Sequence, residues 1–531
     1  MDQKSLMRYV DSLMQDTIDQ HSPGAAVVVY VDREPVLIQG YGAANLEYEM
    51  PIQGRTVFDS GSLAKQFTAY AVSLLIERNM LSLGEDIRTY LPEFPESSGK
   101  ITVGHLLYHT SGLQEWGDIL QIAGWRFGDE ITMDDVRALI PRMNSRNFAP
   151  GEQFEYVNTG YTLLAEIISR IAGEPFHQWM DRNVFGSIGM KHSFFNDDLY
   201  KVVPGMAYSY RLADRGTYAK CRDYLRVAGS SSLYTTIEDL GQWLGHLLDG
   251  GSVVERMAVP GQLADGSVTN YAFGLFLGQH NKVQVLEHGG KYAGYRSALS
   301  FIPEKRIGVA LLSNLESLKE WDIVRGIIEF LLNDSEEEQV AAQSGQPLRS
   351  VQHVPDQEIS GHYLICEGHV AVIGIEDGQV FWKITGGPKF ELVPHFQDNF
   401  IDQDGDPVVF YRNGDNRIDS MTLIWCGEEK RVQKIVPVSD GVEAYAGVYY
   451  NSGLNVAYRM IVREKELYAE HMKHGSMELF HYQRDHFSGE HYWFRSVQFV
   501  RENDQVIGCI VSSAIQAKNI YFTRIDRSIL L

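Results

Sequence analysis

The most reactive arrangement in the sequence is a serine and a lysine three positions apart. Ser62 and Lys65 stand at the head of the apolar stretch "SLAKQFTAYAVSLLIER" (62–78). Three residues is just under one helical turn, so both side chains share one face of a helix. A serine hydroxyl needs a base, and burial lowers the pKa of a lysine so that it can act as one. The pair predicts nucleophilic catalysis, against the alternative of a helix-capping serine beside a surface lysine.

A second SxxK match, "SSGK" (97–100), shows how weak the motif is by itself. A chain of this length is expected to contain about two such matches by chance. The second match follows "LPEFPE" and has the composition of a loop, with no helix to align its side chains. We interpret it as accidental.

Two further motifs support the first pair. Tyr156 and Asn158 form a YxN motif just before a predicted core helix, and the single HGG of the chain, at 288–290, precedes a predicted strand. The alternatives are a core tyrosine with a helix cap, and a structural histidine before a glycine turn. A zinc pair at His105 and His109 is rejected because position 106 is leucine rather than the glutamate of HExxH, and no third ligand is evident.

The first 335 residues, which contain these motifs, show both strand and helix patterns. Helical periods are expected over 63–77, 161–173 and 321–334, a hairpin over "GAAVVVYVD" and "EPVLIQGYG" (24–42), and strands over 297–314. Strands at both ends around a helical middle predict one α+β domain whose antiparallel sheet joins the two ends of the segment.

The remaining residues predict a different kind of structure, consisting of a linker followed by short strands. Residues 336–357 are polar and aperiodic and are expected to be a linker. Short strands and turn signals follow, and "FELVPHFQDNF" (390–400) is echoed by "MELFHYQRDHF" (477–487). This weak duplication predicts two antiparallel β-barrel domains, over 358–440 and 441–531.

The composition limits the kinds of molecule that the protein is expected to bind. The chain has 531 residues and a formal net charge of −22, which argues against nucleic acid or an anionic membrane surface. Its four cysteines are widely spaced, and no export signal or membrane-spanning stretch is visible, so a cytoplasmic location with free thiols is expected. The turn "DQDGDP" (402–407) lacks the glycine position and the glutamate of a calcium loop, and we expect no metal or other cofactor.

The ordered set SxxK, YxN and HGG resembles the serine β-lactamase and penicillin-binding-protein superfamily, in its class C β-lactamase branch. The resemblance spans about residues 20–335 and includes "LSLGEDIRTYLPEFP", "ITVGHLLYHTSGL" and "AGSSSLYTTIEDLGQWL". With two barrels behind it, the chain is most similar to the three-domain D-aminopeptidases of that branch. The resemblance implies a class C β-lactamase/D,D-peptidase-like catalytic domain over 1–335, with a helical lobe beside the sheet.

The resemblance also implies roles. Ser62 would form an acyl-enzyme, with Lys65 as base or proton relay and Tyr156 passing the proton to the leaving group. Asn158 would hold the lysine and the substrate carbonyl. The oxyanion hole would use the backbone N–H groups of Ser62 and of Lys291, which follows the small residue Gly290. Asn270 is a candidate for the wall of the site.

One departure from the family pattern bears on the substrate. Penicillin-recognising relatives carry a lysine where this chain has His288, and a histidine, mostly neutral near pH 7, attracts a carboxylate less strongly. This favours a peptide or amide substrate with a free N-terminal amine, or one with no charge at the acyl end. The resemblance to the D-aminopeptidases then implies a D-stereospecific aminopeptidase. Amine-binding candidates are Glu115, Asp118, Asp223 or the loop 483–491.

Several alternatives stay open at this stage. An esterase, a D,D-carboxypeptidase or a weak β-lactamase could use the same machinery. The chain could also be a β-lactam-binding sensor, or a protein whose barrels dock a partner. The relative suggests that a homodimer is possible.

Overall fold

The computed structural model divides into two compact units. It describes residues 3–526 except 16, 33, 97–98, 127, 214–215, 281, 334–356, 397, 439–440 and 515. The first unit runs to Trp116 and resumes at Gly128; the second contains the segment that begins at Gly117 and the C-terminal region. The predicted linker, except for Gln357, and half of the second SxxK match lie outside the described residues.

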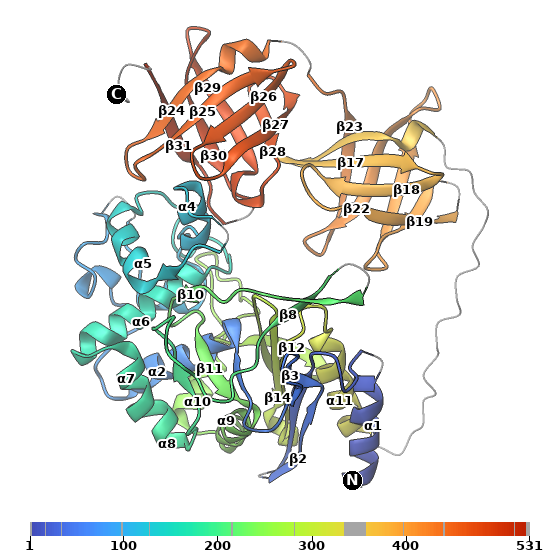
Figure 1. Ribbon diagram of the computed structural model, residues 1–531. Helices are drawn as coiled ribbons and strands as arrows, with labels where there is room; N and C mark the ends of the chain where they lie inside the picture. Colours follow the sequence, from blue (N-terminus) through green and yellow to red (C-terminus); the bar gives the residue numbers. More distant parts are fainter. Residues whose placement is uncertain are drawn as a thin grey trace. The chain divides into compact units, whose positions relative to one another are not determined.

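A six-stranded antiparallel sheet forms the centre of the first unit (Figure 1). In spatial order its strands are β12 (Phe276–His280), β13 (Val283–Tyr292), β14 (Tyr295–Ile302), β15 (Ile307–Ser313), β1 (Ala25–Val31) and β2 (Glu34–Tyr41). The predicted hairpin is β1 and β2, and β1 also pairs with β15. The sheet therefore joins the two ends of the unit, as the sequence predicts.

Helices bury both faces of this sheet. Val27 and Val29 share an apolar cluster with α1 (Gln3–Gln15) and α11 (Glu320–Asn333). The opposite face carries Val28 against Gly241 of α9 (Ile237–Asp249). Because both faces are covered, β1 reads as the continuous apolar run "AAVVVYV" rather than as an alternating strand.

Two buried helices in the first unit carry the candidate catalytic residues. A short 3₁₀ turn, Gly61–Leu63, leads into α2 (Ala64–Glu77), which is buried on nearly every side. Helix α6 (Asn158–Ala172) ends at Gly173, whose φ of 68° is the left-handed conformation that glycine adopts freely. The smaller helices are α3 (Val103–Leu107), α4 (Trp116–Ile122), α5 (Met133–Leu139), α7 (Phe176–Met180), α8 (Gly186–Ile188) and α10 (Ser252–Met257).

Several short strands lie outside the six-stranded sheet of the first unit. They form one three-stranded and three two-stranded sheets among the described residues. In spatial order these are β5 (Val57–Asp59), β11 (Leu233–Thr236) and β7 (Phe194–Phe195); β10 (Leu225–Arg226) and β6 (Ile131–Thr132); β3 (Ala43–Asn45) and β4 (Met50–Pro51); β8 (Tyr210–Leu212) and β9 (Tyr218–Lys220). Strand β5 leads directly into the turn that carries Ser62.

The C-terminal region forms two closed antiparallel barrels of eight strands each, which confirms the predicted architecture. Barrel one comprises β16 (Gly361–Cys366), β17 (His369–Glu376), β18 (Gln379–Ile384), β19 (Phe390–Phe396), β20 (Asn399–Ile401), β21 (Pro407–Arg412), β22 (Ile418–Trp425) and β23 (Glu428–Ile435). Barrel two comprises β24 (Gly447–Asn451), β25 (Val456–Arg463), β26 (Glu466–His471), β27 (Gly475–Gln483), β28 (His486–Gly489), β29 (Ser496–Glu502), β30 (Gln505–Ser512) and β31 (Ile520–Ile525).

The duplication extends to individual side-chain contacts. A tyrosine of the first strand donates to the carbonyl four residues earlier in each barrel, and an arginine pairs with an aspartate at matching places. These contacts are Tyr363 Oη to Ile359 O, 2.7 Å; Tyr449 Oη to Tyr445 O, 2.8 Å; Arg412 Nε to Asp398 Oδ2, 2.9 Å; and Arg501 Nε to Asp485 Oδ1, 2.7 Å. The echoed segments noted in the sequence thus occupy equivalent strands.

Barrel two also holds the segment that begins at Gly117. Tyr458 Oη donates to Ile122 O at 2.8 Å, and His474 Nε2 donates to Gln121 O at 2.8 Å. The Lys473 ammonium lies 5.1 Å from the centroid of the Trp125 ring. This segment follows Glu115 and Trp116 of the first unit directly in the chain.

Candidate active site

Ser62 and Lys65 meet at the start of α2. Lys65 Nζ lies 3.0 Å from Ser62 Oγ, which confirms the geometry expected from their spacing. Ser62 is partly exposed, whereas the Lys65 side chain is completely buried. A nucleophile reachable from solvent therefore sits against an amine that is not.

The surroundings of Lys65 favour its neutral form. Burial lowers its pKa to about 7, and the negative charge of Glu115 opposes that shift only in part. Besides Ser62, the amine has two neighbours, Asn158 Oδ1 at 2.7 Å and the backbone carbonyl of Ser230 at 2.9 Å. Both can only accept hydrogen bonds. In the protonated form the third N–H bond goes to Ser62 Oγ, whereas in the neutral form these two acceptors take both N–H bonds and leave the lone pair toward the Ser62 hydroxyl.

Tyr156 completes the immediate surroundings of the nucleophile. Its side chain hydrogen-bonds to Ser62, and its ring centroid lies 4.8 Å from Lys65 Nζ. Burial raises the pKa of Tyr156 far above its ordinary value, so the phenol keeps its proton near neutral pH. Between these two groups, Lys65 is the one that can act as a base, and Tyr156 can pass a proton only by donating and accepting at the same time.

The segment that carries Tyr156 and Asn158 is anchored from two sides. Glu115 Oε2 accepts the Asn158 backbone N–H at 2.5 Å, and Glu115 Oε1 accepts from Asn158 Nδ2 at 3.3 Å. His109 Nδ1 accepts the Val157 N–H at 3.2 Å, from a backbone φ of 56°. Glu115 thus fixes which way the Asn158 amide points, with its oxygen toward Lys65.

The predicted oxyanion donors lie where strand β13 passes the nucleophile turn. A Cβ added to Gly61 would lie 2.9 Å from the Lys291 nitrogen, and one added to Gly290 would lie 2.8 Å from the Ser62 nitrogen and overlap the Ser60 carbonyl oxygen. Glycine at both positions permits this close backbone approach. The Lys291 side chain is largely exposed, 3.7 Å from Glu320, so its backbone is the part that adjoins Ser62.

His288 is buried behind the site and carries no charge near neutral pH. Its Nδ1 lies 2.7 Å from the Gly289 carbonyl oxygen and must donate to it, so Nε2 accepts from Tyr271 Oη at 3.2 Å. Burial and the Lys65 charge lower the pKa of His288 to about 3. The imidazole is therefore neutral near pH 7, and its geometry is that of a residue that positions its neighbours.

Asn270 is the predicted site residue that the contacts do not bring to Ser62. It is exposed, and its carbonyl accepts from Leu277 N at 2.8 Å. The next residue, Tyr271, is fully buried and packs its ring against those of Tyr156 and His288. Asn270 was proposed from the family resemblance; Tyr271 gave no signal in the sequence, because an apolar aromatic side chain there is expected to belong to the core.

The acidic candidates for an amine pocket are engaged elsewhere. Glu115 holds Asn158, and Asp223 pairs with Arg226 at 2.7 Å. Asp118 belongs to the second unit, as does the loop 483–491. Neither Glu115 nor Asp223 therefore offers a free carboxylate to a substrate amine.

Asp59 is a positioning residue that sequence reasoning missed. It is almost completely buried at the end of β5, and its Oδ1 accepts the Gly61 N–H at 2.8 Å, beside the nucleophile. Burial, and next the charge of Asp223, raise the pKa of Asp59 to about 8. A lone aspartate three positions before the start of "SLAK" gave no signal, because only the fold places Asp223 near it.

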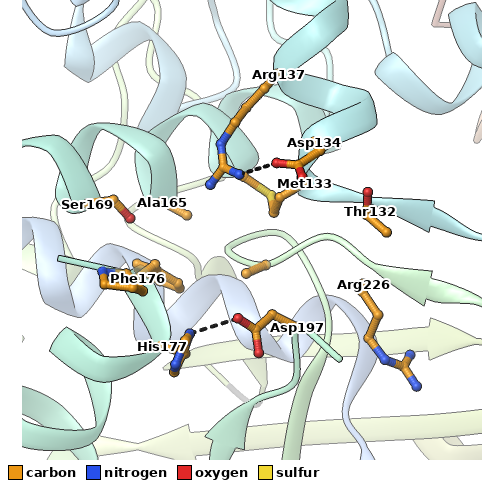
Figure 2. A pocket seen from close by; sticks show the side chains of 12 residues that line it. Thr132, Met133, Asp134, Arg137, Ala165, Ser169, Phe176, His177, Asp197 and Arg226 are labelled. Atoms are coloured by element: carbon orange, nitrogen blue, oxygen red, sulfur yellow. Dashed lines mark hydrogen bonds and ion pairs between the residues drawn. The ribbon is translucent and has the colours of Figure 1, made fainter. Parts of the chain in front are cut away.

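A cavity of about 270 Å³ lies among the helices of the first unit, away from these residues (Figure 2). Among its lining side chains, His177 Nδ1 lies 2.9 Å from Asp197 Oδ2, and Arg137 pairs with Asp134 at 2.6 Å (Figure 2). Neither Ser62 nor Lys65 lines it. The cavity is separate from the candidate chemistry.

The assembled residues can perform acyl transfer. A serine, a neutral amine and a protonated phenol converge, with two backbone amides beside them. Among the described residues, no group of three or more His, Cys, Asp or Glu side chains could hold a metal ion. The same part of the chain contains no helix with the length and apolar content to span a membrane.

Comparison with known proteins identifies the first unit. The sequence profile of the beta-lactamase family matches residues 6–328. Penicillin-binding protein 4* of Bacillus subtilis (strain 168) is 24% identical over 447 residues, which cover 80% of this chain and 97% of that protein. The D-aminopeptidase of Gluconobacter oxydans (strain 621H) is 26% identical over 303 residues, covering 55% of this chain and 56% of that protein.

The solved structures extend the likeness into the barrels. The octameric penicillin-binding protein homologue from Pyrococcus abyssi superimposes with a TM-score of 0.58 at 20% identity, over 88% of this chain and 98% of that one. At this identity the match concerns the fold. The resemblance to the serine β-lactamase and penicillin-binding-protein superfamily is confirmed.

Proposed function

Because this chain belongs to the beta-lactamase family of serine hydrolases, we propose that it cleaves amides of D-amino acids through an acyl-enzyme on Ser62. The observation that carries the proposal is the set of contacts around Lys65. Two carbonyl acceptors occupy its N–H bonds and leave its lone pair toward Ser62 Oγ, 3.0 Å away. A fully buried lysine with a pKa of about 7 is poised for general-base work.

The reaction begins with proton removal. Lys65 takes the proton of the Ser62 hydroxyl while Oγ attacks the substrate carbonyl carbon. The carbonyl oxygen becomes an oxyanion beside the backbone amides of Ser62 and Lys291, and each such donor is worth about a hundredfold to a thousandfold in rate. The proton returns through Tyr156 to the leaving nitrogen, the C–N bond breaks, and the amine departs. Water, deprotonated by the same base, then releases the acid and frees Ser62.

The charges near Ser62 support a substrate that brings no carboxylate to the site. His288 is neutral, and the Lys291 ammonium is largely exposed beside Glu320. A β-lactam or a D-Ala-D-Ala terminus would bring a carboxylate to a site where His288 supplies no positive charge and the Lys291 ammonium already lies next to Glu320. A D-aminoacyl amide brings none, which supports aminopeptidase or amidase activity over carboxypeptidase or β-lactamase activity.

A substrate panel tests this proposal. D-alanine p-nitroanilide, its L-isomer, p-nitrophenyl butyrate and a chromogenic cephalosporin are compared on the full chain, with Ser62→Ala as the blank. Preferential turnover of the D-anilide supports the proposal. Turnover of the ester alone, or of the cephalosporin above the D-anilide, contradicts it. A stable mass adduct with a β-lactam and no product release would identify a sensor instead.

The assembly state is a separate proposal. The Pyrococcus abyssi homologue is described as octameric. We expect this chain to form a homodimer or a larger homo-oligomer, which light scattering after size-exclusion chromatography would measure directly.

A further inference from the structure

The second unit contains a cavity where barrel one adjoins barrel two. Its volume is about 650 Å³, within the range of small-molecule sites. Glu367, His369 and Trp425 of barrel one line it together with Arg495 and Lys518 of barrel two. These residues have no part in the site built around Ser62.

Hydrogen bonds between the barrels hold the walls of this cavity in place. Ser496 Oγ donates to Glu367 Oε1 at 3.1 Å, and Ser488 Oγ donates to the Gly368 carbonyl at 2.7 Å. Arg495 donates through Nη1 to carbonyls of both barrels, those of Thr385 and Gly489. The cavity is therefore preformed, and a ligand would bind without first ordering its walls.

Arg495 is a buried cation without a counter-charge. Its side chain is 94% buried (6% relative exposure), and its Nε–H has no hydrogen-bond partner among the described residues. In that part of the chain no carboxylate lies within ion-pair distance of it. A guanidinium stays charged even when burial lowers its pKa, so a bound anion would stabilise this buried positive charge.

The charge of the cavity wall runs against that of the whole chain. The chain carries a net charge of −22, yet among the described residues that line the cavity Arg495 and Lys518 are cationic and Glu367, which accepts from Ser496, is the one acidic residue. His369 remains neutral because burial lowers its pKa. An anion is therefore attracted electrostatically at this cavity, whereas the overall negative charge repels it elsewhere on the protein.

The other wall is apolar. Trp425 packs edge-on to the His369 ring at 5.4 Å, and Ile384 and Pro388 extend this surface. An indole face of this kind accepts a flat aromatic or branched aliphatic group. A ligand that satisfies both walls carries a single negative charge next to an apolar body.

We infer that this inter-barrel cavity binds a small organic monoanion, a carboxylate joined to an aromatic or branched apolar group. The carboxylate lies at Arg495, and the apolar group lies against Trp425. A free aryl carboxylate and the C-terminal carboxylate of a peptide ending in an aromatic residue share this chemistry. Binding here is independent of hydrolysis at Ser62.

Calorimetric titration of the full chain tests the inference. The probes are 1-naphthylacetate and its uncharged partner 1-naphthylacetamide, with N-acetyl-Gly-Phe and its C-terminal amide as the peptide arm. We expect each acid to bind at least tenfold more tightly than its amide, and the tighter acid identifies the source. Equal affinities of acid and amide, or no saturable binding of either acid, would overturn the inference.

Thiol protection locates the binding independently of any substitution at Arg495. Cys426 lines the cavity and is exposed. Saturating 1-naphthylacetate should slow its modification by benzyl methanethiosulfonate at least fivefold, measured by peptide mass spectrometry. Cys221, in the first unit, serves as the internal control and should react at an unchanged rate. Equal protection of both thiols, or of neither, counts against the cavity.

The variant Arg495→Gln removes the charge and keeps donors for the carbonyls of Thr385 and Gly489. Affinity for 1-naphthylacetate should fall at least tenfold while affinity for the amide stays the same. Unchanged acid affinity in a folded variant would contradict the proposal. If that variant unfolds, the protection of Cys426 in the unmodified chain decides the matter.

Discussion

Lys65 in the first unit and Arg495 in the second are both buried basic side chains whose hydrogen bonds go to neutral oxygens. Lys65 contacts Ser62, Asn158 and a backbone carbonyl; Arg495 contacts two backbone carbonyls. Burial lowers the pKa of each. The lysine loses its proton near pH 7, whereas the guanidinium stays protonated. The same burial therefore produces a base in the first unit and an anion site in the second.

The contrast explains why the identity of the cation matters more than its charge. A lysine is useful beside Ser62 because it alternates between two protonation states. An arginine is useful between the barrels because it does not. Substitutions that exchange these properties test the comparison, and the effect on hydrolysis should decrease in the order that follows.

Ser62→Ala removes the group that the amine of Lys65 serves. Hydrolysis should fall by at least about 10⁴-fold, because the remaining groups act only through the nucleophile. Initial rates on whichever panel substrate is turned over provide the measurement. Ser73→Ala, on the same buried helix but bonded to Arg256, is the matched control. Comparable losses in the two variants would mean that folding, not chemistry, was measured.

Lys65→Arg gives the catalytic site the permanent charge of the other region. The rate should fall by about a thousandfold or more, because a guanidinium does not accept a proton in this pH range. Lys291→Ala is the control, since its side chain is largely exposed and only its backbone adjoins Ser62. Substantial activity in the arginine variant would show that a charge, rather than a base, is needed at position 65.

Tyr156→Phe sharpens the assignment of the base. The ring remains, but the hydroxyl that bonds to Ser62 is lost. Amide hydrolysis should fall by about a hundredfold, because a leaving amine needs the relayed proton. An ester should lose clearly less, since its leaving alkoxide or phenoxide is the better leaving group. Equal losses for the anilide and p-nitrophenyl butyrate would argue against the relay.

Arg495→Lys places a side chain that can lose its proton in the cavity. The rate of hydrolysis should stay within about twofold of that of the parent chain, because the two sites are independent. Its signature is in binding. The affinity of the variant for 1-naphthylacetate should fall as pH rises from 6 to 9 and the buried ammonium deprotonates, whereas the parent chain should stay flat. A flat profile in both proteins would remove the distinction drawn between the two cations.

The sequence predicted what local spacing controls. Ser62 and Lys65 meet because three residues is nearly one turn, and the barrels follow from alternating strands and turn residues repeated along the chain. Gly173 ends its helix because glycine adopts a positive φ without cost. These features depend on residues close together in the chain, where composition and period are informative.

The sequence could not predict what long-range approach controls. Glu115 was taken as an amine-pocket candidate, yet it orients Asn158, 43 positions away. The carbonyl of Ser230 belongs to a serine-rich stretch in which no residue stands out, and a backbone oxygen leaves no trace in a side-chain motif. The burial of His288 beside Tyr271 and Tyr156 is likewise a property of the folded core, which the HGG motif does not reveal.

The rate at which phenylmethanesulfonyl fluoride modifies Ser62, followed by intact mass between pH 5 and 10, tests the central claim without assuming a substrate. A lysine whose pKa is lowered is protonated, and unable to act as a base, below that pKa. The rate should therefore rise about tenfold per pH unit below pH 7 and level off above it, with a midpoint near 7. A rate that does not depend on pH, or one that still rises toward pH 10, would contradict the claim that Lys65 is the base and loses its proton near pH 7.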